Sequence, residues 1–365
     1  MGFFSSLFGK KEPKKARIID DLQIEIAHRS PLENKTNQFM ELSTFFEASK
    51  YFNQAKRVHF LGWEDPLEHP QFFEMFKIAR ENSSQLEITT LGTKLNPSNI
   101  KELTNLSPDK ITINFNYPIV TLNNVSENIM GLVKQRKNDT KIILDFVMTQ
   151  DSISDLPSFV EQAGDLGIDE INASNINFII SPETNSKKAF EGIISDENRG
   201  DLIKQGKAKG KEEYEAFINQ AKKIADRKNV YFNPKPLIGN EAITCDYNPL
   251  KNVFVTWDGL ITPCPYLALK NVRAFFNEKE FEQPSFIIGN INETNFLDLW
   301  SDKRYLDFRG VYDRRIKLFN TYMDETFDNE PTSQLIHINY QKLDQQLAEE
   351  KVPVVCANCY KVYGI

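Results

Sequence analysis

The sequence predicts an α/β fold: a partial (β/α)6 barrel followed by a small α+β metal-binding domain. Two observations predict it. Short runs rich in β-branched and other apolar residues alternate with amphipathic helical segments from residue 17 to about residue 235, and this alternation is typical of βαβ units in a parallel sheet. All four cysteines lie in the last third of the chain, at Cys245, Cys264, Cys356 and Cys359. Their clustering indicates a metal site in the segment that follows the barrel.

Six strands and six helices are expected in the barrel. Each strand is a short apolar run that ends near a glycine or a polar residue, and the strands cover residues 16–27, 57–62, 86–92, 110–116, 141–149 and 168–176. Each helix has apolar residues at helical spacing, and the helices cover residues 41–55, 69–84, 96–106, 125–138, 155–167 and 211–229. Ligands of such folds bind where the parallel strands end.

The pattern changes after about residue 235. Pro234, Pro236 and Pro249 punctuate a linker, and residues 252–264 then predict a β-hairpin because Asp258-Gly259 is a strong two-residue turn signal. Residues 292–350 are mainly helical in character. We therefore expect a tail over residues 1–16, a barrel over 17–235 and a metal-binding domain over 236–365.

Composition and charge exclude some classes of function. The net charge of −7 gives no reason to expect binding to nucleic acid. No apolar run approaches the roughly 20 residues that span a bilayer. The first residues place Phe3, Phe4, Leu7 and Phe8 before a lysine-rich run, which is read either as a flexible tail or as a segment in weak contact with an anionic membrane surface. Four clustered cysteines without a signal peptide predict a cytoplasmic protein.

Six motifs in order carry a resemblance to a known family. They are "LGWEDPLEHPQFFEMFKIA", "ITTLGTKL", "FVMTQDSISDLPSFVEQAGDLGIDEINASNI", "VFVTWDGLITPCPYLAL", "IGNINETNFLDLWSDKRYLDFR" and "CANCY". Over residues 20–365 the chain resembles the radical SAM proteins that carry a C-terminal SPASM or twitch-type auxiliary-cluster domain. The resemblance implies a TIM-like partial barrel of radical SAM type, and a second domain that binds an iron–sulfur cluster.

The residues that would hold S-adenosylmethionine (SAM) in that family are altered in this chain. The resemblance implies a Cys-x3-Cys-x2-Cys loop for a [4Fe–4S] cluster, and the positions that match it hold Ser30, Asn34 and Asn37. Thiolates are the ligands that bind such clusters, and hydroxyl and amide groups are poor substitutes. The family's Gly-Glu-Pro step is Glu64-Asp65-Pro66 here, and the asparagine of Thr-Asn-Gly-Thr is Leu91. We therefore expect no SAM in the barrel.

The four cysteines can satisfy either a [4Fe–4S] cluster or a tetrahedral zinc ion. A Cys-x2-Cys pair, Cys356 and Cys359, presents two thiolates from one turn, and Cys264 follows the predicted hairpin. The spacing leaves the two alternatives open, and the resemblance favours one iron–sulfur cluster. Four thiolates would occupy all four irons of such a cluster and leave none to bind a substrate. The role of the cluster would therefore be structural or in electron transfer.

These features predict a pseudoenzyme, without the first cluster and with the second. It would act by binding a peptide or a protein partner, such as an active radical SAM enzyme. Two alternatives remain at this point: an active SAM-dependent maturase of a peptide, protein or cofactor, and an electron carrier that uses the auxiliary cluster alone. The altered pocket around Ser30, Asn34, Asn37, Glu64 and Asp65 could instead hold another small polar ligand.

Overall fold

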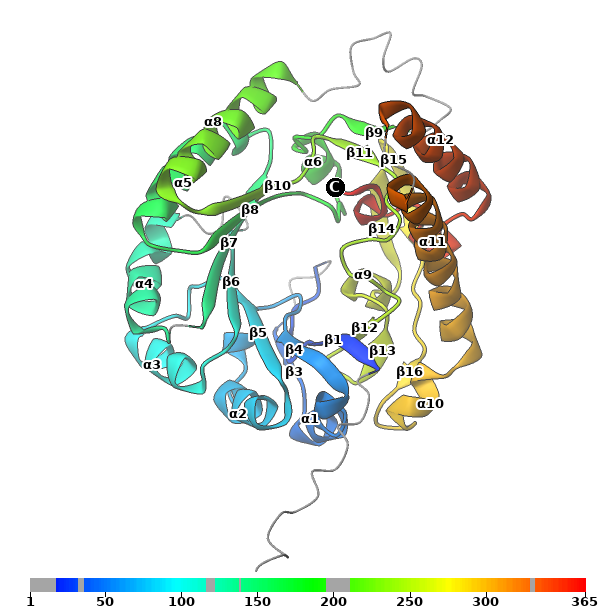
Figure 1. The fold of residues 1–365 in the computed structure, drawn as a ribbon. Helices are drawn as coiled ribbons and strands as arrows, with labels where there is room; N and C mark the ends of the chain where they lie inside the picture. Colours follow the sequence, from blue (N-terminus) through cyan, green and yellow to red (C-terminus); the bar gives the residue numbers. More distant parts are fainter. Residues whose placement is uncertain (1–17, 32–35, 116–121, 138, 195–210, 329–331) are drawn as a thin grey trace, which may run out of the picture.

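The computed structural model describes residues 18–31, 36–115, 122–137, 139–194, 211–328 and 332–365. Its strands form an incomplete ring, with most of the helices on the outside (Figure 1). The main sheet has ten strands in the order β10-β8-β7-β6-β5-β4-β1-β12-β13-β16. The tail expected over residues 1–16 and the altered position Asn34 lie outside the described residues.

All six predicted barrel strands are confirmed, and they lie side by side in parallel. A seventh parallel strand, β10, which we did not predict, pairs with β8. The bounds of these strands are β1 (Ile19–Ile24), β4 (Ala55–Phe60), β5 (Gln85–Thr90), β6 (Lys110–Phe115), β7 (Lys141–Met148), β8 (Glu170–Asn175) and β10 (Tyr231–Pro234).

The six predicted barrel helices are also present, on the outer face of the sheet (Figure 1). Phe60 shows why they pack there: its side chain is fully buried and contacts the rings of Phe72 and Phe76 on the second helix. The Asn96 side chain begins the third helix by accepting a hydrogen bond from the amide of Asn99 at 3.0 Å. The bounds are α1 (Leu42–Ser49), α2 (Phe72–Asn82), α3 (Pro97–Leu106), α4 (Leu122–Gln135), α5 (Leu156–Asp165) and α8 (Glu212–Lys228).

The inner face of the strands is polar, whereas closed barrels of this class are usually filled by branched apolar side chains. Arg57 donates to Asp21 at 2.9 Å and lies 3.5 Å from Glu87, and Lys110 lies 2.6 Å from the other oxygen of Glu87. On the same face His59 contacts the Thr89 hydroxyl at 2.9 Å. Alternating charges on four neighbouring strands therefore replace part of an apolar filling.

The segment after residue 235 extends the same sheet. The predicted hairpin is confirmed as β12 (Asn252–Val255) and β13 (Leu260–Thr262), and β12 pairs in parallel with β1. Residues 272–283, which are rich in charged side chains, form a second hairpin. The other elements of this segment are β11 (Ile238–Asn240), β14 (Val272–Phe276), β15 (Lys279–Gln283), β16 (Gly289–Asn290), α9 (Pro265–Ala268), α10 (Phe296–Trp300), α11 (Lys303–Asp328) and α12 (Ser333–Glu349).

A few short elements complete the described chain. Within the barrel half, β2 (Ala27–His28) and β3 (Gln38–Phe39) form a small antiparallel pair, and β9 (Gly192–Ile194) pairs with β11. The short helix α6 (Pro182–Ser186) lies between β8 and β9 in the chain. Across the described ranges, no helix is both long enough and apolar enough to cross a membrane.

Arg315 on α11 connects three segments of the second half of the chain. Its side chain is fully buried. Its guanidinium donates to the carbonyl oxygens of Ile243, Ala242 and Glu350 at 3.0, 2.9 and 2.6 Å, and pairs with the carboxylate of Glu241 at 2.7 Å. The planar fork of arginine suits this arrangement, which a lysine could not reproduce. Arg315 thus fixes the long helix against the two segments that lead to Cys245 and Cys356.

We expect acid to destabilise the fold partly through His59. Burial lowers the pKa of His59 below its usual range, so the folded protein keeps this imidazole neutral. The unfolded chain takes up that proton below about pH 6.5, and stability is therefore lost as the pH falls from there towards the folded pKa. Urea unfolding at about pH 7.5 and about pH 5.5 should show a smaller loss for His59→Gln than for the unmutated chain. Equal losses would contradict this role.

We expect Arg315→Met to lower the free energy of unfolding by about 3 kcal/mol or more, because it leaves buried carbonyl groups without their charged donor. The neighbouring residue provides a matched control. Arg314 is exposed and pairs only with the Glu350 carboxylate at 2.8 Å among the contacts described for it, so Arg314→Met should cost at most about 1 kcal/mol. Urea unfolding followed by circular dichroism measures both, and similar losses would show that Arg315 is not a clamp.

Candidate metal centre

The structure brings the four predicted cysteines to one place. Cys245 lies in the loop after β11, Cys264 directly precedes α9, and Cys356 and Cys359 flank one tight turn near residue 357 in which the Cys359 amide donates to the Cys356 carbonyl at 3.1 Å. None of the four forms a disulfide. The pKa of Cys264 is raised by burial and, in addition, by the charges of Cys356, Cys359 and Cys245. The four thiols are therefore electrostatic neighbours.

Burial decides the charge of these thiols. It raises the pKa of Cys245 to about 12, and the neighbouring Cys359 adds to the rise. It also raises the pKa of Cys356 and of Cys359. Protons would therefore stay on the thiols at neutral pH unless a cation replaced them, and metal binding would release those protons. This is the behaviour of ligands that need a metal to become thiolates.

Backbone amides near the sulfur atoms oppose the effect of burial. The Tyr247 amide lowers the pKa of Cys245, and the Leu267 amide lowers that of Cys264. The Lys361 amide acts in the same direction on the pKa of Cys359. Donors aimed at ligand sulfurs stabilise thiolates and tune the metal that they bind. The residues present therefore fit a thiolate-bound metal group.

Local geometry places each cysteine. The turn of the β12–β13 hairpin needs glycine at Gly259, because its φ is +87° and a Cβ there would lie 2.6 Å from the Asn292 side chain. Thr256 also donates to Asp258 in this turn at 2.5 Å. The returning strand β13 then carries Cys264 to the centre. The Asn248 amide donates to the Cys245 carbonyl at 2.9 Å and turns the chain after Cys245.

An aromatic cluster that we did not predict connects the metal centre with the barrel. The rings of Tyr247 and Tyr266 are 5.8 Å apart, Tyr266 stacks on Phe178 at 4.7 Å, and both Phe178 and Tyr266 contact Trp63 at the end of β4. Burial raises the pKa of both tyrosines, and nearby thiols add to it. One signal was available in the sequence: Tyr247 and Tyr266 each follow a ligand cysteine by two residues.

The altered barrel positions lie around the ends of the strands. Ser30 and Asn37 are both half-buried. Ser30 follows β2 and Asn37 precedes β3, and these two strands pair with each other. Asp65 is buried, and its carboxylate accepts hydrogen bonds from the Thr90 hydroxyl at 2.7 Å and from the amides of Leu67 and Leu91 at 3.0 Å each. The Asp65 carboxylate is therefore engaged within the protein, and of Leu91 only the backbone takes part.

Glu64 points elsewhere. One of its carboxylate oxygens accepts from the amide of Asp65 at 2.8 Å, and the other lies 3.9 Å from the Arg29 guanidinium. Its side chain stands where the related motif has a glycine, at the position where the backbone would need to approach a ligand closely. Glu64 and Asp65 thus share one edge, and their carboxylates contact different partners.

Glu25 and His28 are further residues of this edge that sequence reasoning missed. Glu25 is buried, accepts from the Trp63 amide at 3.0 Å and lies 3.0 Å from the His28 imidazole. His28 in turn stacks on Trp257, in the turn of the β12–β13 hairpin, with the ring centroids 5.9 Å apart. A Cβ at Gly62 would lie 2.6 Å from the Glu25 side chain, so glycine is required there. These contacts hold the barrel edge and the second domain together.

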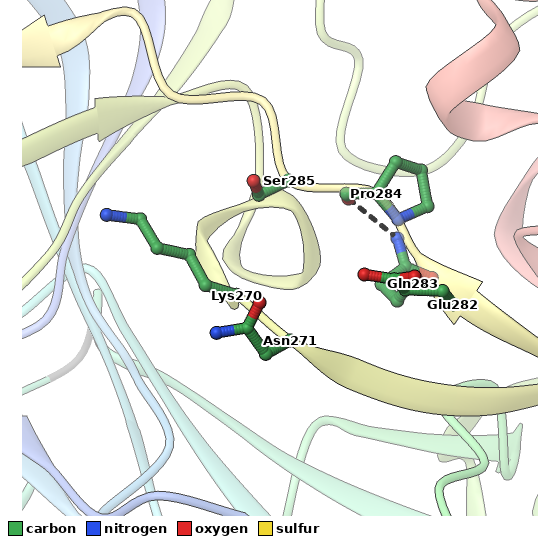
Figure 2. Close-up of a pocket in the computed structure, with 6 residues that line it drawn as sticks. All are labelled: Lys270, Asn271, Glu282, Gln283, Pro284 and Ser285. Atoms are coloured by element: carbon green, nitrogen blue, oxygen red, sulfur yellow. Dashed lines mark hydrogen bonds between the residues drawn. The ribbon is translucent and has the colours of Figure 1, made fainter.

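A separate pocket of about 430 Å³ lies beside the β14–β15 hairpin. Figure 2 shows Lys270 and Asn271 on one of its sides and Gln283 and Pro284 on the other, with Ser285 between them. None of the residues that the sequence predicted as ligands, or as the altered SAM pocket, lines it. The candidate site is therefore the cysteine centre and not this pocket.

We expect Asp65→Asn to lower the free energy of unfolding by about 1–3 kcal/mol, because an amide cannot accept from all three of the donors that face Asp65. Glu64→Gln is the matched control and should change stability by about 0.5 kcal/mol or less. Urea unfolding at neutral pH measures both variants. If Asp65→Asn were as stable as Glu64→Gln, the carboxylate would not be a structural group.

Comparison with known proteins identifies a described domain in the second half of the chain. Residues 245–324 match the model of the SPASM domain, described as an iron–sulfur cluster-binding domain. The chain is 26% identical over 278 residues to the tungsten-containing aldehyde ferredoxin oxidoreductase cofactor-modifying protein of Pyrococcus furiosus, covering 71% of each chain.

Two solved structures share the fold. SuiB of Streptococcus suis, bound to S-adenosylmethionine, has a TM-score of 0.54 at 14% identity over 80% of this chain and 68% of that one. The structure of anSMEcpe with AdoMet and the Kp18Cys peptide has a TM-score of 0.50 at 14% identity over 80% and 83%. The predicted fold is confirmed: the protein is a partial TIM-like barrel of radical SAM type followed by a SPASM segment.

Proposed function

We propose that the protein is a non-catalytic relative of the radical SAM enzymes, which keeps one auxiliary [4Fe–4S] cluster and works by binding a peptide or protein partner. The observation that carries the proposal is the contrast between its two sites. At the barrel edge, Ser30, Asn34 and Asn37 stand at the positions that match the family's three cysteines. The Asp65 carboxylate there already accepts hydrogen bonds from Thr90 and Leu91. At the second site four thiols and their donors are grouped together.

The match of residues 245–324 to an iron–sulfur cluster-binding domain favours a cluster over a single zinc ion. Four cysteine thiolates are the ligand set that a [4Fe–4S] cluster needs, with one cysteine on each iron. When bound, it supplies an electron-transfer centre or a structural staple.

A bound peptide in a structure of the same fold indicates the class of partner. The anSMEcpe structure contains a bound peptide, and its fold is shared by this chain. A peptide or a protein segment is therefore our choice for the ligand, and SAM is not expected to bind. The name of the Pyrococcus relative favours a cofactor as the alternative ligand class. Four free thiols are consistent with the reducing cytoplasm in which we place the protein.

We expect protein purified without oxygen to contain about four irons and about four sulfides per chain, with the absorption of an iron–sulfur cluster. Cys356→Ser should lose most of that iron, since one of four ligands is gone, whereas Asn37→Ala at the barrel edge should keep it. Titration calorimetry should detect no binding of SAM. About eight irons per chain, or SAM cleavage under reducing conditions, would mean that the barrel is an active site. Zinc without sulfide would overturn the cluster.

A further inference from the structure

We propose that the open edge of strand β15 binds a basic, extended peptide segment of the partner as an added β-strand. The inference rests on the proposed function, because it gives the peptide or protein partner a surface and a charge. Among the described elements, β15 (Lys279–Gln283) pairs only with β14, in a two-stranded antiparallel sheet. None of its residues belongs to the cysteine centre or to the altered barrel positions.

The first support is the direction of the backbone groups of β15. The hairpin turns at residues 277–278, whose φ angles are +45° and +65°, and such a two-residue turn is flanked by a hydrogen-bonded residue pair. Bonded and non-bonded pairs then alternate along the strands, so the amides and carbonyls of Glu280 and Glu282 point away from β14. Phe275, which lies opposite Glu280, confirms this alternation: its amide leaves the hairpin and donates to the Ile179 carbonyl at 2.8 Å.

The rest of the hairpin is fixed to the protein, and one edge stays open. At the tip, the Asn277 amide donates to the Tyr360 hydroxyl at 2.9 Å. The Glu278 carboxylate accepts from the Asn185 side chain at 2.7 Å and pairs with Lys188. Within the described ranges, no backbone group of β15 has a backbone partner outside the ladder to β14. A fixed strand with an unpaired edge can accept a further strand.

The second support is the charge along this edge. Glu280 and Glu282 are exposed, and they lie on the same face of the hairpin because they are two residues apart in a strand. Arg273 of β14 lies 3.5 Å from the Glu280 carboxylate, and no ion pair of the described chain includes Glu282. Opposite charges on facing strand residues attract and like charges repel. An added strand with lysine or arginine at alternate positions therefore matches this edge, and a second copy of β15 does not.

The third support is the pocket of about 430 Å³ at the base of the hairpin. Glu282 and Gln283 belong to β15 and also line this pocket (Figure 2). The other polar groups of its lining are the Lys270 ammonium, the Asn271 amide and the Ser285 hydroxyl. A peptide that follows β15 would reach this pocket with one end. Strand-adding sites take affinity from main-chain hydrogen bonds and specificity from such pockets.

The two ends of the main sheet are less suited to the same role. They are β10, which has four residues and ends in Pro234, and β16, which has two residues. Proline has no amide to donate to a further strand. β15 has five residues and no proline, and it offers two outward amides.

The experiment measures the binding of a fluorescein-labelled peptide of alternating lysine and valine to the full chain, purified without oxygen, by fluorescence anisotropy. One matched peptide has glutamate in place of lysine, and another has N-methyl groups on the backbone nitrogens of its lysines. We expect the lysine peptide to bind, and both matched peptides to bind about tenfold more weakly or worse. The first loses the charge match, and the second loses main-chain donors while it keeps its charge.

Two variants place the bound peptide on β15. Glu280→Lys with Glu282→Lys should weaken binding of the lysine peptide by about tenfold, because two attractive pairs become repulsive. Glu282→Pro should weaken it as well, because proline removes an outward amide and leaves the ladder to β14 intact. The control is Glu81→Lys with Glu102→Lys, which changes the net charge equally at exposed helix positions and should leave binding within about twofold. Circular dichroism checks that each variant is folded.

The outcomes separate this inference from the function on which it rests. Equal binding of the lysine peptide to the double β15 variant and to the unmutated chain would overturn the inference, and so would tight binding of the N-methylated peptide. If only the glutamate peptide binds, a peptide-binding function stands and the β15 site is wrong. If no peptide binds, the inference and the peptide partner are both contradicted, whereas the iron and sulfide content of the same sample still tests the cluster.

Discussion

The pairing of β1 with two parallel neighbours is the constraint on which the two sites depend. Ile24 lies opposite Phe60 of β4 and Val255 of β12, and the Glu25 amide continues the ladder by donating to the Val255 carbonyl at 2.9 Å. Parallel strands end at the same edge of a sheet. The end of β1, the Trp63 loop and the turn that carries Trp257 are therefore brought to one edge, although they come from distant parts of the sequence.

That shared edge explains why the barrel and the metal centre behave as parts of one structure. The stack of His28 on Trp257 and the cluster of Trp63, Phe178 and Tyr266 both cross from the barrel to the second domain. Aromatic contacts of this kind add to the free energy of burial. A change at the cysteine loops can therefore reach the barrel edge through packed side chains.

The polar interior of the barrel follows from its incomplete ring. A closed barrel of eight strands is filled by its own apolar side chains, but the ring here leaves an inner face that apolar residues alone do not fill. Arg57 lies between Asp21 and Glu87 and pairs with one oxygen of each carboxylate. Paired charges of this sort cost less to bury than isolated ones. The ion pairs give the inner face specific partners on adjacent strands.

The sequence by itself determined the elements and the ligands. Periodicity located the six strands and helices, the Asp258-Gly259 turn gave the hairpin, and the four cysteines stood out by position, because each of these signals is local in the chain. Only the tertiary structure decided how they meet. It decided that β12 joins β1, that Asp65 turns to Thr90, and that Arg315 from a distant helix binds the carbonyl of Ile243. Hydrogen-bond partners far apart in sequence are set by packing, and no local pattern records them.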